Sequence, residues 1–111
     1  MSVTHVRETI HVSEAPRNYV KDPLVDPACL NEACSLFVRL DVAPHSEMPV
    51  HQHVGETETY YFLSGSGVYN DNGTEVNVQA GSVAFCGDGQ SHGFVNDSDE
   101  TVSLIALILK S

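Results

Sequence analysis

Apolar and polar positions alternate along most of this chain, and the clearest alternation begins at residue 36. Apolar residues occupy positions 36, 38, 40 and 42, and Arg39 and Asp41 lie between them. A period of two is typical of a β-strand with one buried face. Pro44 ends this strand, because a proline nitrogen cannot donate a hydrogen bond to a central sheet ladder. Similar short runs follow, and the strands they predict cover residues 36–42, 48–53, 58–63, 68–70, 75–78, 82–86, 92–96 and 101–109.

Turn-forming residues separate these runs. Asp71, Asn72 and Gly73 predict a hairpin between the runs on either side of them, and residues 87–90 form a glycine-rich loop. Many short strands joined by such turns are typical of an all-β sandwich or barrel. A chain of 111 residues has the length of one domain.

The first 34 residues follow a different pattern. They contain Pro16, Pro23 and Pro27 and show little periodicity. We expect an irregular N-terminal arm over residues 1–34, with one short strand near residues 8–12 and a helical turn at residues 27–33. The barrel then occupies residues 35–111.

Composition and charge narrow the classes of partner. The chain has 5 basic and 15 acidic residues and a formal charge of −10, which argues against nucleic acids and anionic membrane surfaces as partners. Its three cysteines, Cys29, Cys34 and Cys86, are an odd number without paired-motif spacing, which favours reduced thiols in a cytoplasmic protein. The N-terminus has no signal-peptide core, and the apolar run at 102–109 is too short to span a bilayer as a helix.

Three histidines and a glutamate are the strongest chemical signal. His51 and His53 are two positions apart, so on a strand their side chains share one face. Imidazole suits Fe, Zn, Cu and Ni, and a carboxylate such as Glu58 adds tolerance for Mn. His92 lies far along the chain and can join them only if the fold brings it back, as a β-barrel would. Glu56 is a rival for Glu58, but we expect it to face solvent.

The residues around this group form two motifs. Residues 51–65 read HQHVGETETYYFLSG, and residues 81–96 read GSVAFCGDGQSHGFVN. Their spacing resembles the two signature motifs of the cupin superfamily, and the resemblance to a small single-domain cupin runs from about residue 42 to residue 109. Gly87 stands where the second motif usually has proline, and His45 stands where the first usually opens with glycine. Both are turn positions rather than ligand positions.

The resemblance implies a double-stranded β-helix, or jelly-roll barrel, with a metal ion at its mouth. The implied ligands are His51, His53, Glu58 and His92, and the ion is a divalent transition metal such as Fe, Mn, Ni or Zn. Three histidines and a carboxylate leave one or two coordination positions open, which separates a catalytic site from a closed structural one.

Strand parity supplies candidates for a substrate pocket. If Glu58 points inward, so does every second residue of its strand, and the same holds around His92. Tyr60 is the candidate catalytic residue, because a phenol can hydrogen-bond a substrate or donate a proton. For each other candidate the alternative is structural: packing in the core, or an exposed arginine paired with a nearby acid. The pocket candidates are Arg39, Tyr60, Phe62, Phe94 and Cys86.

Two hypotheses for function follow. The first is a metal-dependent enzyme acting on a small polar organic molecule, by dioxygenase-, lyase- or isomerase-type chemistry. The alternative is a non-enzymatic module that binds a small molecule or metal. A cupin that has lost its metal ranks last, because all four ligand positions are present. The resemblance also implies a homodimer, with the N-terminal arm or the apolar strand at 101–109 in the interface.

Overall fold

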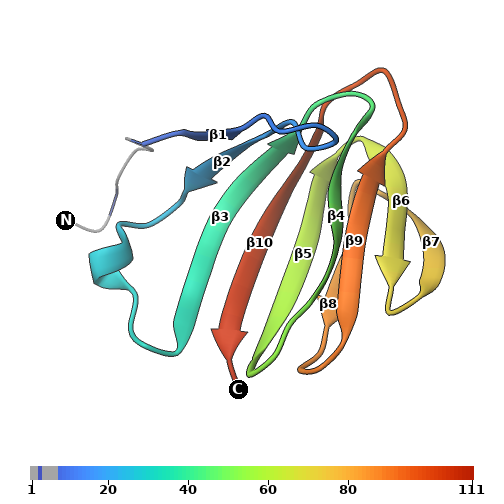
Figure 1. The fold of residues 1–111 in the computed structure, drawn as a ribbon. Coiled ribbons are helices and arrows are strands. Elements are labelled where there is room, and N and C mark those ends of the chain that lie inside the picture. Colours follow the sequence, from blue (N-terminus) through green and yellow to red (C-terminus); the bar gives the residue numbers. More distant parts are fainter. Residues whose placement is uncertain (1–2, 4–7) are drawn as a thin grey trace.

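The computed structural model describes residue 3 and residues 8–111 of the chain. Within these residues two antiparallel sheets face each other and close into a barrel (Figure 1). The six-stranded sheet has the order β1 (Ile10–Val12), β2 (Tyr19–Pro23), β3 (Cys34–Val42), β10 (Val102–Lys110), β5 (Glu56–Ser64) and β8 (Val83–Cys86). The four-stranded sheet has the order β4 (Ser46–Gln52), β9 (Ser91–Asn96), β6 (Ser66–Asp71) and β7 (Thr74–Gln79). The predicted all-β barrel is therefore confirmed.

Alternation along the strands builds the core. The even-numbered residues of β3, β5 and β10 turn toward the other sheet, and the most deeply buried of them, each fully shielded from solvent, are Val42, Phe62, Val102, Leu104 and Ala106. Phe94 of β9 packs on Phe62, with ring centroids 5.3 Å apart. Burial of these apolar side chains is the main force that holds the two sheets together.

The N-terminal segment is more regular than expected. The predicted strand near residue 8 is the short β1, and the predicted helical turn is a 3-10 helix over Pro27–Cys29. The expectation of an irregular segment between them was wrong, because β2 pairs with β3, Tyr19 opposite Val42 and Lys21 opposite Leu40. Residues 1, 2 and 4–7 of the predicted arm lie outside the described part of the chain.

The apolar strand at the C-terminal end of the barrel is central. β10 pairs with β3 on one side and with β5 on the other, so both of its edges are occupied. A partner could therefore meet this strand only through its outer side chains, which remain on the surface of the sheet, and its place in a homodimer interface stays a prediction. Among the described residues, no helix is long and apolar enough to cross a membrane.

Two turns explain how the motifs tolerate unusual residues. His45 has a positive φ of 53°, a conformation that glycine adopts without strain, so the usual glycine at this position has a backbone reason. The backbone nitrogen of Gly87 donates to the Gln90 side-chain oxygen at 2.9 Å, a hydrogen bond that proline at this position could not make. These departures change local loop structure and leave the strands around them intact.

Candidate metal centre

Four side chains from three strands and one loop converge between the sheets. His51 lies on β4 directly opposite His92 on β9, Glu58 lies on β5, and His53 follows the end of β4. One ligand atom from each residue lies within 4.8 Å of all the others. The structure therefore brings together the four residues that the sequence predicted as metal ligands.

A bulge in β4 turns the histidines inward. Met48 is buried on this strand, so strict alternation would point His51 away from the interior, but the pairing register shifts between Met48 and His51. Gly93 of β9 makes room for the bulge. A Cβ atom added there would lie 2.9 Å from the backbone nitrogen of Val50. A glycine is thus required beside His92, independently of any turn.

The spacing of the donor atoms fits a bound ion. The Nε2 atom of His53 lies 3.0 Å from Nε2 of His51 and 3.1 Å from Nε2 of His92, and Oε1 of Glu58 lies 2.8 Å from Nε2 of His92. Adjacent ligands at bond lengths of about 2.1 Å around a six-coordinate ion are separated by about 3.0 Å. Three imidazole nitrogens that face one another cannot all be satisfied by sharing protons, whereas a cation satisfies them together.

The outer nitrogen of each imidazole also has a partner. Nδ1 of His51 donates to the backbone oxygen of Pro49 at 2.9 Å, and Nδ1 of His53 donates to Glu56 at 2.8 Å. Nδ1 of His92 lies 2.8 Å from the Tyr69 hydroxyl. Partners of this kind hold the ring orientation and leave the Nε2 lone pair free for a metal.

The contact between Glu56 and His53 corrects one expectation. We expected Glu56 to face solvent, but its carboxylate is only partly exposed and contacts His53. Glu56 and Glu58 are two positions apart on β5, so alternation places both on the inner face. That spacing was the signal by which the sequence could have revealed the role of Glu56.

The electrostatics of the metal-free group favour charge on the carboxylate. Burial acts to raise the pKa of Glu58, but the His51 and His92 imidazoles lower it to about 2. The same carboxylate, 3.9 Å from Nε2 of His51, raises the pKa of His51 above its usual value against the opposing effect of burial. Glu58 is therefore an anion at any ordinary pH, as a metal ligand must be.

Tyr60 and Tyr69 pack against the buried His92. The Tyr60 ring stacks on the imidazole with centroids 4.9 Å apart, and Tyr69 meets it edge-on. Burial, and next the charge of Glu58, raise the pKa of Tyr60 well above its usual value. Tyr60 is therefore a neutral phenol that can donate a hydrogen bond but does not act as a base near neutral pH.

Two loops are joined around His53. Its backbone nitrogen donates to the oxygen of Gln90 at 3.0 Å, and its backbone oxygen accepts from Gly89 at 2.7 Å. The Gln52 side chain donates to the Gly89 oxygen at 2.9 Å. Asp88 accepts from the backbone nitrogen of Gly55 at 2.7 Å. The sequence had indicated no role for the 87–90 loop, and the structure shows that it supports the turn carrying His53.

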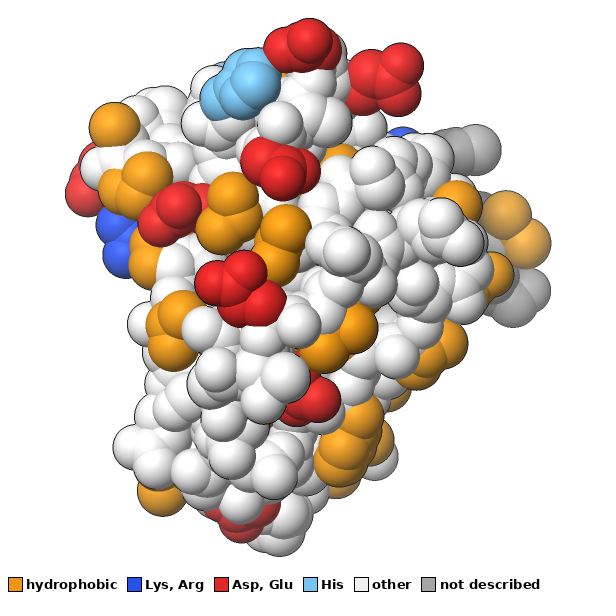
Figure 2. Space-filling model, turned by 90° about the vertical axis from the view of Figure 1, so that its right-hand side faces the viewer, with side chains coloured by type: hydrophobic (Ala, Val, Ile, Leu, Met, Phe, Trp, Pro, Cys, Tyr) orange, Lys and Arg blue, Asp and Glu red, His pale blue; other side chains and the backbone are white. Residues whose placement is uncertain are grey.

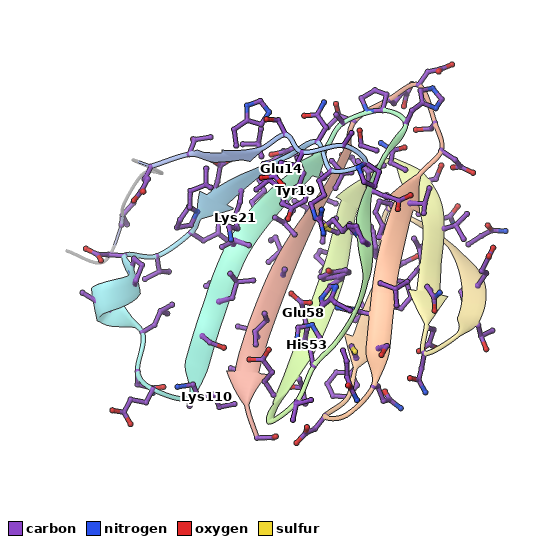
Figure 3. The ribbon with its side chains drawn as sticks, in the orientation of Figure 1. Glu14, Tyr19, Lys21, His53, Glu58 and Lys110 are labelled. Atoms are coloured by element: carbon purple, nitrogen blue, oxygen red, sulfur yellow. The ribbon has the colours of Figure 1, made fainter. Side chains whose placement is uncertain are left out.

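A cavity of about 260 Å³ opens in front of the donor atoms. Basic residues from the N-terminal segment line it together with aliphatic side chains from both sheets. Tyr19 and Lys21 lie on β2, and Glu58 and His53 lie further down between the sheets (Figure 3). The lining residues are Arg17, Tyr19, Lys21, Leu36, Leu40, Met48, Pro49, Val50, His51, His53, Glu58, Tyr60 and Ile108.

The pocket candidates divide between cavity, core and outer surface. Tyr60 lines the cavity, as predicted. Phe62, Phe94 and Cys86 are buried in the core and do not line this cavity, so their structural alternative holds. The prediction of Arg39 as a pocket residue was wrong, because it lies on the outer face of β3 and pairs with Asp41 at 3.2 Å. The basic residues that do line the cavity, Arg17 and Lys21, were missed.

Comparisons with known proteins agree with this geometry. An oxalate-binding protein of Thermotoga maritima is 36% identical over 86 residues, which are 78% of this chain and 71% of that protein. A crystal structure described as a predicted oxalate decarboxylase, also from Thermotoga maritima, aligns with a TM-score of 0.89 and 30% identity over 97% of this chain and 100% of the other. An RmlC-like cupin from Shewanella frigidimarina shares the fold, with a TM-score of 0.78 and 18% identity over 100% of this chain and 92% of the other. The family model of the cupin domain matches residues 38–108, and the chain therefore belongs to the cupin family.

Proposed function

We propose that this cupin holds a divalent transition metal and binds a small carboxylate anion at that metal. The observation that carries the proposal is the position of Arg17 and Lys21. The chain has only five basic residues against fifteen acidic ones, yet two of the five line the cavity in front of the donor atoms. On the face drawn in Figure 2, acidic and apolar side chains are scattered among uncharged atoms, and basic side chains appear only at the margins. An anionic ligand explains why positive charge is concentrated at the cavity.

The residues present have distinct roles in this proposal. His51, His53, Glu58 and His92 would hold the ion, and an ion with open positions supplies electrophilic sites for carboxylate oxygens. Tyr60 can donate a hydrogen bond to a bound oxygen, since its phenol stays neutral. The relatives described as an oxalate-binding protein and as a predicted oxalate decarboxylase favour a ligand of that chemical class.

Binding is the first proposed role and catalysis is the second. Among the described residues that line the cavity, Glu58 is the only carboxylate, and it belongs to the donor group. An isomerase would need a free base near its substrate, so this composition favours binding. The buried Tyr60 phenol is the observation that keeps an enzyme of the lyase or dioxygenase type as the second candidate, because it can deliver a proton.

The test begins with elemental analysis of protein purified without a metal-binding tag. The proposal expects near-stoichiometric Fe, Mn, Ni or Zn, and metal-dependent binding of oxalate by calorimetry on Ni²⁺-reconstituted protein. His51→Ala should remove both the metal and the oxalate binding, because it deletes one donor. The variant should still fold, because the His51 side chain is half-exposed and its loss leaves the core intact. His45→Ala is the matched control, an exposed histidine outside the donor group. Full metal content in His51→Ala would refute the ligand assignment, and consumption of bound oxalate would favour the enzyme.

We also propose that the protein forms a homodimer through the outer face of the six-stranded sheet. Val83 and Phe85 of β8 are 66% and 58% exposed, and Tyr61 beside them on β5 is 47% exposed. Register places Ile105, Tyr61 and Val83 in one row across three strands. Contiguous exposed apolar side chains of this kind are typical of interaction surfaces. Light scattering should give twice the chain mass, and Phe85→Glu should reduce it to the monomer mass.

A further inference from the structure

The cavity has two chemically different ends. His51, His53 and Glu58 lie at one end, and Arg17 and Lys21, from the N-terminal segment, lie at the other. Lys21 is opposite Leu40 in the β2–β3 pair, and opposite residues in antiparallel strands present their side chains to the same face. Leu40 is buried inside the barrel, so Lys21 points toward the interior too.

The sheet register separates these two ends. β3 and β10 lie between Lys21 on β2 and Glu58 on β5, so three strand spacings of about 4.8 Å place the two backbones about 14 Å apart across the sheet. Along the strands, Ile108 links Glu58 to the level of Leu36, whereas Lys21 is level with Leu40. That offset of four residues adds about 13 Å in the second direction. Sheet curvature and long side chains shorten the gap, but oxalate has its two carboxyl carbons bonded directly to each other and cannot span it.

The walls between the two ends are apolar. Leu36, Leu40, Met48 and Ile108 line the cavity, and Leu36 and Ile108 are paired across β3 and β10. A volume of about 260 Å³ leaves room for a ligand several times the size of a water molecule. Oxalate alone would leave most of this apolar-walled space filled with water, whereas methylene groups would displace that water favourably.

The backbone at the basic end of the cavity is held in place by hydrogen bonds. The backbone oxygens of Pro16 and Asn18, on either side of Arg17, accept hydrogen bonds from Glu47 and Ala43, both at 2.9 Å. Within the described residues, neither Arg17 nor Lys21 forms an ion pair with a carboxylate, in contrast to Arg39 with Asp41. Two cations on an anchored backbone, without a protein counter-ion, are suited to an anionic group of a ligand.

We infer that the preferred ligand is a dicarboxylate with an apolar spacer, bound by the metal at one end and by Arg17 and Lys21 at the other. This rests on the proposed function and extends it, because it makes ligand length and the second charge the determinants of specificity. Arg17 and Lys21 are then specificity residues that contact the ligand, and neither takes part in holding the metal.

The test is calorimetry on Ni²⁺-reconstituted full-length protein with a series of ligands. The series comprises oxalate, succinate, glutarate and adipate, together with butyrate, pentanoate and hexanoate, which match the three longer dicarboxylates in chain length but lack the second carboxylate. Binding of at least one longer dicarboxylate should exceed that of oxalate and of its monocarboxylate partner by roughly tenfold, the scale of a charge-assisted hydrogen bond. The Arg17→Gln, Lys21→Gln double variant should lose this advantage while retaining full Ni²⁺. The charge control is the Arg39→Gln, Lys110→Gln double variant, which removes two cations that do not line the cavity and should bind as the unaltered protein does (Lys110 is labelled in Figure 3).

The outcomes separate the inference from the proposed function. If oxalate binds as tightly as every longer dicarboxylate, or if the double variant keeps the preference for a longer one, the inference is wrong and metal-dependent anion binding stands. If no carboxylate binds the Ni²⁺-loaded protein, both are wrong. A double variant that also lost Ni²⁺ would show that these residues support the metal site itself, which would overturn their assignment to the ligand.

Discussion

Replacing Glu56 by glutamine tests whether the contact between Glu56 and His53 supports the metal centre. The Glu56 carboxylate accepts a hydrogen bond from Nδ1 of His53 at 2.8 Å, and its negative charge makes the opposite nitrogen a stronger donor to a cation. Glutamine keeps an oxygen acceptor at this position and removes only the charge. Loss of an outer partner of this kind lowers metal affinity by roughly ten- to a hundredfold.

The exposure of Glu56 sets where in that range the effect should fall. Its side chain is 29% exposed, so water screens part of the charge. We therefore expect Glu56→Gln to weaken Ni²⁺ binding by about tenfold, or about 1.4 kcal/mol. Glu56→Leu removes the acceptor as well and should approach a hundredfold, because the His53 ring is then free to rotate.

The assay is competition for Ni²⁺ against a chelator of known affinity, with circular dichroism to verify that each variant is folded. Glu75→Gln is the matched control, since Glu75 is an exposed acid on β7 and its removal changes the net charge equally. If Glu56→Gln and Glu75→Gln bind Ni²⁺ equally well, the contact with His53 contributes nothing to the metal site and the reasoning is refuted.

Two further predictions concern stability. Asn96 is fully buried, and its amide nitrogen lies 3.1 Å from the backbone oxygens of Val42 and Ala43 and 2.7 Å from that of Glu100. Asn96→Ala should therefore lower the free energy of unfolding, measured by urea titration, by about 3 kcal/mol. A loss below about 1 kcal/mol would mean that these contacts are not stabilising. In the metal-free protein the raised pKa of His51 adds stability that is fully present below pH 6.5, the pKa of the unfolded chain, and is lost as the pH rises through the pKa of the folded protein. The lowered pKa of Glu58, about 2, adds stability that is present above pH 4.5 and is lost in stronger acid. The melting temperature of EDTA-treated protein should thus fall from pH 6 to pH 8. That of the Ni²⁺-loaded protein should rise over the same range, because protons compete less with the metal for the imidazoles at higher pH. Parallel changes in both forms would contradict this prediction.

The long strands that the sequence predicted correctly share one property. β3, β5 and β10 bury apolar residues at a period of two, as in residues 36–42, and core packing enforces that pattern. β2 was missed because the inner positions of this strand line a cavity instead of the core. Tyr19 and Lys21 alternate correctly, but their polar groups hide the period, and Pro23 closes the strand. A search for alternating apolar residues therefore overlooks the strand that contributes Lys21 to the ligand cavity.

The donor group was predictable and its surroundings were only partly so. The resemblance to the two cupin motifs implied all four donor residues, and the structure brings them together. The bulge between Met48 and His51 has no clear signature in the residues themselves, although the adjacent Pro49 is consistent with a break in the ladder. Arg39 illustrates the opposite error, since the alternation of its own strand already pointed it outward.

The origin of the cavity residues limits what family membership says about the ligand. The donor residues on β4, β5 and β9 all lie within the matched cupin region, residues 38–108. Arg17, Tyr19, Lys21 and Leu36 lie before that region, yet they line the same cavity. The part of the chain that identifies the family thus specifies the metal centre, and a preceding segment contributes the charge that we propose selects the ligand. Relatives that share the two motifs are therefore expected to bind metal alike and to differ in ligand wherever the segment equivalent to β2 carries other side chains.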